Sequence, residues 1–127
     1  TQITGTAVAT QAQMEAETAN VVVAANLLKN SPGVAKGWCQ IGGAGGLNSP
    51  SYNITSITDT DVGNRTIVWN TDFSGTIYVC VGAVNEDSAA SNVCSYDTFA
   101  VGSVRHLTRQ NGTLTDLASG SVAFGDQ

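Results

Sequence analysis

Charge is scarce in this sequence: charged residues occupy 12% of the 127 positions, against about 25% in ordinary soluble domains. Five residues are Lys or Arg and ten are Asp or Glu, which gives a formal net charge of −5. A nucleic-acid-binding face needs clustered Lys and Arg to neutralise phosphates. We therefore expect no nucleic-acid partner.

Long apolar runs and a secretory leader are missing as well. The longest nearly apolar run covers residues 21–28 and contains an Asn, far short of the roughly 20 apolar residues that a membrane-spanning helix needs. No signal-peptide pattern is present. Because the sequence begins at Thr1, we expect it to be a fragment of a longer chain.

The sequence has few residues suited to catalysis or metal binding. His106 is the only histidine, and no GxSxG motif supports its pairing with Ser103, so we expect His106 at a surface or interface. Cys39, Cys80 and Cys94 form no CxxC pair, and a Cys/His zinc site is not predicted. We interpret the cysteines as free, partly buried thiols of a protein folded in a reducing cytosol. A Cys80–Cys94 bridge is the alternative. No cofactor and no catalytic residue are predicted.

Acidic residues gather in turn-like segments without forming a metal-binding loop. Asp59 and Asp61, followed by Asn64, faintly resemble a calcium loop. They lack its DxDxDG order and its closing Glu. We expect these side chains to stabilise a turn.

Small polar residues replace the missing charge. Gly, Ser, Thr and Asn together account for 50 of the 127 residues, and hydrophobic residues for 42%. Gly and Asn suit turns, Thr suits pleated surfaces, and the hydrophobic content argues against disorder. Residues 34–127 are therefore predicted to form a mostly β domain, an antiparallel β-sandwich of about six to eight strands.

Alternating patterns locate individual strands of this domain. Residues 65–70 alternate, and residues 52–58 form a strand whose phase changes at Ile57, which indicates a bulge or bend. Residues 76–81 are apolar on both faces, which predicts a central strand between two layers. Asn111-Gly112 is a strong hairpin signal. Four aromatic residues in strand phase are assigned to the core: Trp38, Trp69, Tyr78 and Phe124. Tyr52 is assigned to the scaffold.

Residues 1–33 have a different character and form a predicted connector. Thr10 and Gln13 match a capping box, which predicts a short helix from Thr10 to about Glu17. Its Ala-lined face buries too little to be stable alone, so it is expected to pack on copies of itself. An extended segment over residues 21–23 and one helical turn over residues 24–29 are expected to follow.

Several segments, in order, resemble the C-terminal domain of bacteriophage tail fibres. Residues 32–38, PGVAKGW, are similar to the family's HPGVAKAWV, and residues 52–59, YNITSITD, to its YNVSSITD. Residues 102–105 (GSVR), 112–116 (GTLTD) and 122–125 (VAFG) continue the resemblance. Residues 9–33 are similar to a tail-fibre connector but have Val23-Ala24-Ala25 where Thr-Pro is common. The resemblance brings no catalytic residues with it.

The resemblance implies a function, a set of partners and a location. It implies a host-recognition domain at the distal end of a fibre that mediates adsorption, with a homotrimer as its assembly. A host cell-surface glycan or outer-membrane protein would be the receptor, and other virion tail proteins further partners. The location implied is the virion, after assembly in the cytoplasm of the host bacterium. Exposed loops carry binding on rigid β scaffolds, so the predicted receptor contacts are Phe73, Asn85, Glu86, Asp87, Asn92 and Tyr96.

Two functions of other classes remain open on the sequence alone. One is a purely structural virion domain, such as a fibre cap or a tail or capsid decoration. The other is a polysaccharide-degrading enzyme, which needs paired carboxylates such as Asp59 or Asp61 with Asp72.

Overall fold

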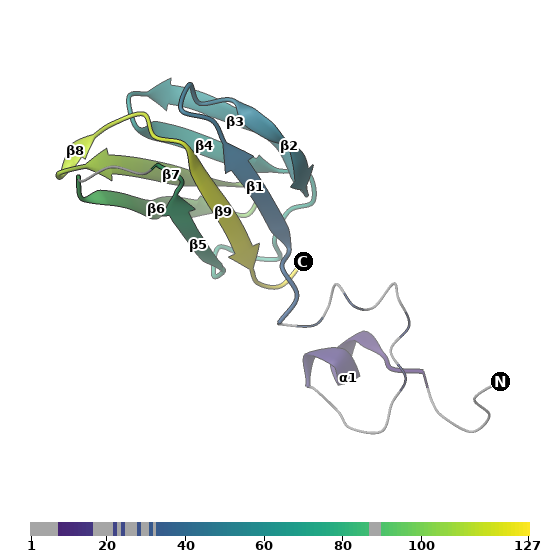
Figure 1. Cartoon of the computed structure of the whole chain (residues 1–127). Helices are drawn as coiled ribbons and strands as arrows, with labels where there is room; N and C mark the ends of the chain where they lie inside the picture. Colours follow the sequence, from purple (N-terminus) through teal and green to yellow (C-terminus); the bar gives the residue numbers. More distant parts are fainter. Residues whose placement is uncertain are drawn as a thin grey trace.

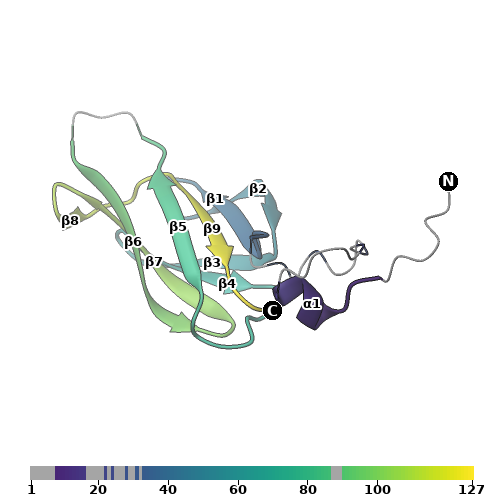
Figure 2. The ribbon, with the colours of Figure 1, turned by 90° about the horizontal axis from the view of Figure 1, so that it is seen from below.

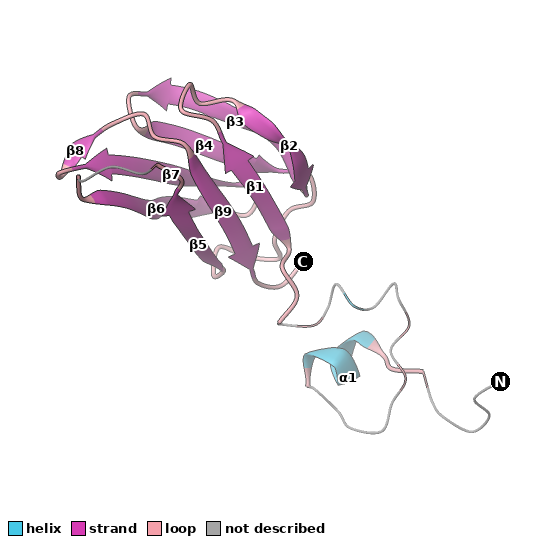
Figure 3. Cartoon of the chain, in the orientation of Figure 1, coloured by secondary structure: helices cyan, strands magenta, loops and turns pink. Residues whose placement is uncertain are grey.

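The computed structural model describes residues 8–16, 22, 24, 28, 31, 33–86 and 90–127. Strands dominate these residues, and they form two antiparallel sheets packed face to face (Figures 1 and 3). The predicted β-sandwich is confirmed, with nine strands in place of six to eight. The helix α1 (Gln11–Glu15) lies outside the two layers (Figure 1).

Each sheet takes strands from distant parts of the chain. The first sheet has the order β2-β1-β9-β5, and the second has the order β3-β4-β7-β6, with β8 paired to β7. Figure 2 shows the two layers from below. The bounds of the strands are β1 (Gly37–Ile41), β2 (Leu47–Tyr52), β3 (Ile54–Asp61), β4 (Asn64–Trp69), β5 (Val79–Val84), β6 (Asn92–Ala100), β7 (Ser103–Gln110), β8 (Thr113–Leu114) and β9 (Ser119–Phe124).

An aromatic cluster fills one end of the space between the sheets. Trp69 is at the end of β4, and its ring meets Phe73 edge-on at 5.4 Å between ring centroids. Phe73 stacks on Tyr78 at 4.0 Å and 6°. The indole Nε1 of Trp69 donates to the Tyr78 hydroxyl at 3.2 Å, and this hydroxyl lies 2.7 Å from the carbonyl oxygen of Ser103. The assignment of Trp69 and Tyr78 to the core is confirmed.

The predicted strand over residues 52–58 divides into two strands in different sheets. Tyr52 ends β2, Asn53 has a positive φ of 58°, and Ile54 begins β3. Asn tolerates positive φ better than most residues, which allows a corner here. The expected bulge is present as a register shift between Ile54 and Ser56. β2 itself was not predicted. It contains Pro50, which is tolerated there because β2 is an edge strand.

The strand predicted over residues 76–81 is not central. The strand that forms is β5, an edge strand that pairs with β9 and with no other strand of the described residues. Its two apolar faces therefore differ in environment: Cys80 is half-buried, whereas Val79 and Val81 are exposed. Trp38 and Phe124 were also assigned to the core, yet Trp38 is exposed and Phe124 only half-buried. Strand phase shows which side chains of one strand share a face, but it does not show which face is buried.

Two local predictions, the helix cap at Thr10 and the hairpin at Asn111-Gly112, are confirmed. Thr10 caps α1: its Oγ1 accepts from the backbone N–H of Gln13 at 3.3 Å, and Gln13 Oε1 accepts from the Thr10 N–H at 2.9 Å. Asn111 and Gly112 have φ values of 51° and 85° and join β7 to β8. Glu17 and most of the predicted extended segment and turn over residues 21–29 lie outside the described residues.

A buried arginine joins the two sheets at the other end. Arg65 of β4 shares the inward face of Ile67 and Trp69 and is fully buried. Its Nη1 donates to the Leu117 carbonyl at 2.8 Å, and its Nη2 donates to the Gly43 carbonyl at 2.9 Å. One guanidinium group thus binds backbone that flanks both β1 and β9.

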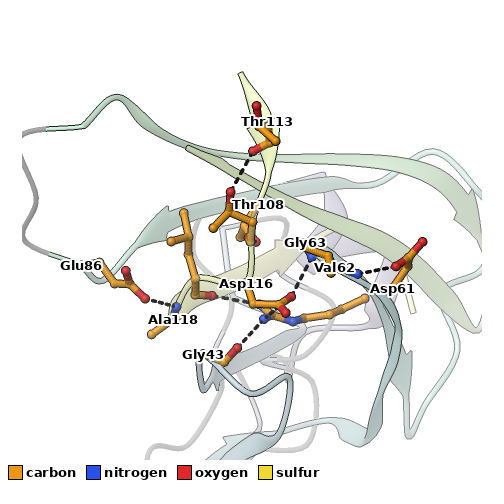
Figure 4. Close-up of polar contacts among 12 residues, drawn as sticks. Gly43, Asp61, Val62, Gly63, Glu86, Thr108, Thr113, Asp116 and Ala118 are labelled. Carbon is orange, nitrogen blue, oxygen red and sulfur yellow. Dashed lines mark hydrogen bonds and ion pairs between the residues drawn. The ribbon is translucent and has the colours of Figure 1, made fainter. Parts of the chain in front are cut away.

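Asp116 completes this arrangement, and Figure 4 shows it between Gly43 and Gly63. Its Oδ1 lies 3.2 Å from Arg65 Nη2 and accepts from the Gly63 N–H at 2.7 Å. Gly63 has φ 62° and occupies the β3–β4 turn, where a Cβ would meet Thr115 backbone. The turn predicted over residues 59–64 is shorter than expected, because β3 continues to Asp61.

We predict that Arg65→Met lowers the free energy of unfolding by about 2–4 kcal/mol, because it leaves buried carbonyl oxygens without donors. Asp116→Asn is the matched control. Its side-chain oxygen still accepts from Gly63, and the Asp116 side chain is 40% exposed, so the expected loss is below about 1 kcal/mol. Urea unfolding of both variants measures the difference. Equal losses would show that the ion pair, and not the carbonyl contacts, provides the stabilisation.

Candidate functional site

A surface hollow of about 360 Å³ lies where β2 ends and the chain passes into β3. Its lining side chains are uncharged, and three of the five are amides. The chain segments after β2, after β4 and at residue 127 meet there, so the hollow depends on the tertiary structure. The lining residues are Tyr52, Asn53, Asn70, Thr71 and Gln127.

Asn53 holds the backbone on the two sides of the hollow together through hydrogen bonds. Its Oδ1 accepts from the Thr71 N–H at 2.6 Å, and its Nδ2 donates to the Thr71 carbonyl at 3.1 Å. The Asn53 carbonyl also accepts from the Asn70 N–H at 3.0 Å. Gln127 Nε2 donates to the same Thr71 carbonyl at 3.0 Å. The Asn53 amide therefore holds the two chain segments together as a strand pairing would.

Tyr52 and Asn70 supply the groups that face solvent. The Tyr52 side chain is 51% exposed, and Asn70 is exposed. Within the described part of the chain, neither the Tyr52 hydroxyl nor the Asn70 amide makes a side-chain hydrogen bond. An aromatic face beside donor and acceptor amides suits an uncharged, polyhydroxylated ligand, with apolar C–H groups on the ring and hydroxyls on the amides.

The structure reverses the roles expected of two aromatic residues. Phe73 was predicted to contact a receptor from a loop, yet its side chain is only 3% exposed because it stacks in the aromatic core. Tyr52 was assigned to the scaffold and is exposed instead. The sequence did contain a signal that Tyr52 would be exposed, because Pro50 and Asn53 indicate that Tyr52 lies at the end of an edge strand.

Tyr96 also lies inside the sandwich, contrary to its prediction as a loop contact. It belongs to β6 and packs edge-on against His106 at 5.2 Å between ring centroids. Its hydroxyl reaches towards Gly82 of the opposite sheet, where an added Cβ would collide with it. Burial raises the pKa of the Tyr96 phenol. Residues 85–92 were predicted to form an exposed loop because that segment is the most polar of the chain, and Tyr96 was predicted to lie beside it.

The other predicted contacts lie away from the hollow. Asn85 and Glu86 follow β5 and are exposed. The Asn85 N–H donates to the Ala118 carbonyl at 2.8 Å. Glu86 Oε1 accepts from the Ala118 N–H at 3.0 Å. Asn92 begins β6, and its Oδ1 accepts from Gln110 Nε2 at 3.3 Å. Asp87 lies outside the described residues.

Strand register shows how far these residues are from the hollow. Tyr52 pairs with Trp38 at one end of β1, whereas Ser119 pairs with Ile41 at the other end and with Val84, which precedes Asn85. The hollow and the β5–β6 connection therefore occupy opposite ends of the four-stranded sheet.

His106 is not the surface residue that was expected. It is fully buried on the inward face of β7, and Ser103 lies on the opposite strand phase, so these two side chains cannot form a catalytic pair. Burial first, and the nearby Arg65 second, lower the pKa of His106 from 6.5 to about 4. Within the described residues, neither ring nitrogen has a hydrogen-bond partner.

The acidic residues considered for hydrolysis are not brought together. Asp59 and Asp61 flank the start of β4, and Asp72 follows its end, a separation on the order of 20 Å at about 3.3 Å per residue. Glycosidase carboxylates lie within about 10 Å. Asp61 Oδ1 accepts from the Val62 N–H at 2.8 Å, as the prediction of turn chemistry implies. Among the described residues no group of three or more His, Cys, Asp or Glu could hold a metal ion.

All three cysteines are free thiols, as predicted. Burial raises the pKa of Cys39 to about 11 and that of Cys80 to about 12. These thiols are therefore protonated near neutral pH and are poor nucleophiles.

Comparison with protein-family models, curated proteins and solved structures gave no match in any of the three searches. No helix among the described residues is long and apolar enough to cross a membrane.

We predict that acid destabilises the fold through His106. As pH falls from 6.5 to about 4, the unfolded state binds a proton that the folded state does not. Stability is complete above pH 6.5 and falls below it, by about 3 kcal/mol between pH 7 and pH 4. His106→Gln removes this contribution. Urea unfolding at both pH values measures it, and equal losses in the wild type and the variant would contradict the assignment.

Proposed function

We propose that this chain is a glycan-binding, host-recognition domain of a bacteriophage tail fibre. The observation that carries the proposal is the exposed ring of Tyr52 beside the amides of Asn70 and Gln127 in a hollow of about 360 Å³. This volume falls in the range of small-molecule sites, about 300–1,000 Å³. The resemblance of residues 32–38 and 52–59 to tail-fibre sequences supports the biological setting.

The chemistry of the hollow favours a neutral sugar over a charged ligand. The side chains of its five lining residues carry no charge, so an anionic group would gain no ionic partner from them. A sugar presents both an apolar face for Tyr52 and hydroxyls for amide donors and acceptors. One shallow site of this kind binds weakly, and a fibre that displays several copies on one virion strengthens attachment through effective concentration.

Cytosolic assembly accords with the state of the cysteines. Cys39, Cys80 and Cys94 are unpaired, and thiols persist in the reducing cytoplasm of a bacterium. We therefore propose the virion as the location of the mature domain, after folding in the host cytoplasm.

We predict that Tyr52→Ala lowers affinity for bacterial surface glycans at least about tenfold, equivalent to about 1.4 kcal/mol or more. Asn70→Ala is expected to lower it by a smaller factor, because it removes hydrogen bonds but leaves the ring. Biolayer interferometry against immobilised lipopolysaccharide and capsular polysaccharide measures both. Val93→Ala is the control, since Val93 is equally exposed on the other sheet. Binding that survives Tyr52→Ala would contradict the site.

The β5–β6 connection is tested separately. Asn92 already belongs to β6, so a loop exchange must be confined to residues 85–91. If adsorption to host cells is lost in this variant but retained in Tyr52→Ala, the β5–β6 connection, and not the hollow, is the receptor-binding surface. Adsorption retained in both variants would favour a purely structural virion domain.

A further inference from the structure

The outer face of the four-stranded sheet carries a row of aromatic and aliphatic side chains that begins at the hollow. Tyr52 of β2 lines the hollow and pairs with Trp38 of β1, which pairs with Val122 of β9. Val122 pairs in turn with Val81 of β5. Strand alternation points all four side chains outward, and Figure 1 shows the four strands side by side in this order. The row therefore leads out of the hollow and across the whole sheet.

A row of amide side chains lies beside the first row. Gln40 of β1 pairs with Asn48 of β2 and with Gly120 of β9. Gln40 and Asn48 are exposed, and within the described residues neither amide makes a side-chain hydrogen bond. The amide nitrogen of Asn85 lies 3.9 Å from the position that a Cβ on Gly120 would occupy. Hydrogen-bond donors and acceptors therefore border the apolar row at several points.

Gly120 opens a trough between the two rows. The trough is a shallow depression of about 370 Å³ that runs from Trp38 to Val81 and Ala83, with Gly120 and Val122 between them. Apart from its chain neighbours, a Cβ on Gly120 would meet no atom closer than 3.9 Å, and the backbone there does not adopt a positive φ. The fold would therefore accept a larger residue, but the missing side chain leaves the surface open to a ligand.

The outward positions around the trough carry no charge. The outer face of the other sheet, in contrast, carries the Asp97–Arg105 ion pair. An anionic ligand would find no Lys or Arg partner in the trough, and lipid tails would leave the amides of Gln40 and Asn48 without hydrogen bonds. The surface instead suits a neutral ligand that presents both apolar C–H faces and hydroxyl groups.

The trough is longer than one sugar. Three strand spacings separate β2 from β5, so Tyr52 and Val81 lie on the order of 14 Å apart at about 4.8 Å per spacing. A single sugar ring on Tyr52 covers only the first part of this distance. A chain of sugars repeats ring faces and hydroxyl groups along its length, as the two rows repeat apolar side chains and amides across the sheet.

We propose that the glycan-binding site extends from the hollow along this trough, so that its ligand is an extended segment of an uncharged polysaccharide and not a single terminal sugar. This inference rests on the proposed function. Tyr52 holds one sugar in the hollow, and Trp38, which is 39% exposed, stacks on the next. The chain then passes over Gly120, and the amides of Gln40 and Asn48 bind its hydroxyl groups.

The dependence of affinity on chain length tests this proposal. The 127-residue chain is titrated with neutral bacterial O-antigen saccharides, in series that begin with the disaccharide and extend to long fragments, and isothermal titration calorimetry gives each dissociation constant. We expect the wild type to bind long fragments at least about tenfold more tightly than the disaccharide, because only they reach Trp38 and the trough. Longer fragments also offer more positions at which binding can begin, so the decisive comparison is between variants.

Two trough variants, Gly120→Val and Trp38→Ala, are compared with Tyr52→Ala. Gly120→Val fills the trough with a residue that favours strands, and we expect both trough variants to lose the gain from chain length. Tyr52→Ala is expected to weaken binding of fragments of every length. Thr66→Val is the matched control for Gly120→Val, because Thr66 points outward from a strand of the other sheet that also has a neighbour on each side. Circular dichroism checks each fold, and binding of the disaccharide by Gly120→Val shows that the hollow is intact.

A gain from chain length that is lost in both trough variants but retained in Thr66→Val supports the proposal. A gain that persists in both trough variants overturns it, as does a wild type that binds all lengths equally, while weaker binding by Tyr52→Ala still upholds the hollow. If no neutral saccharide binds, or if Tyr52→Ala binds as the wild type does, the proposed function itself fails. An oligomer in sedimentation velocity that Trp38→Ala dissociates without changing the chain-length dependence assigns the face to a second copy and also overturns the proposal.

Discussion

The buried guanidinium of Arg65 holds the two sheets in register at one end of the sandwich. It sits on β4 of one sheet and donates to carbonyls that flank β1 and β9 of the other, at Gly43 and Leu117. Asp116 extends the network to the β3–β4 turn (Figure 4). A buried cation is costly unless it is paired and hydrogen-bonded. Any packing that displaced these carbonyls would leave the charge poorly solvated, so the network selects one arrangement of the sheets.

The interior therefore has two different halves. The aromatic rings of Trp69, Phe73 and Tyr78 fill one end, where burial of apolar area stabilises the fold. Arg65 and His106 lie side by side in the β4–β7 register near the other end. The hollow lined by Tyr52 lies beyond the aromatic half, because its lining residues Asn70 and Thr71 directly follow Trp69 in the chain.

The two sheets also differ on their outer faces. The five-stranded sheet carries the Asp97–Arg105 ion pair, and Arg109 donates to Ser95 Oγ at 3.0 Å. The outward positions of β1, β5 and β9 carry no charged residue. The proposed glycan-binding hollow lies at the end of β2, next to this uncharged face, because Tyr52 pairs with Trp38.

The sequence by itself determined the β-sandwich class, the capping box at Thr10, the hairpin at Asn111-Gly112 and which residues of a strand share a face. These features depend on local backbone preferences and on the two-residue period of a strand. Only the tertiary structure decided which face points inward. It exposed Tyr52 and Val81, buried Phe73, Arg65 and His106, and joined three segments into one hollow. The physical reason is that strand phase fixes relative orientation, whereas burial depends on which sheet and which neighbours cover that face.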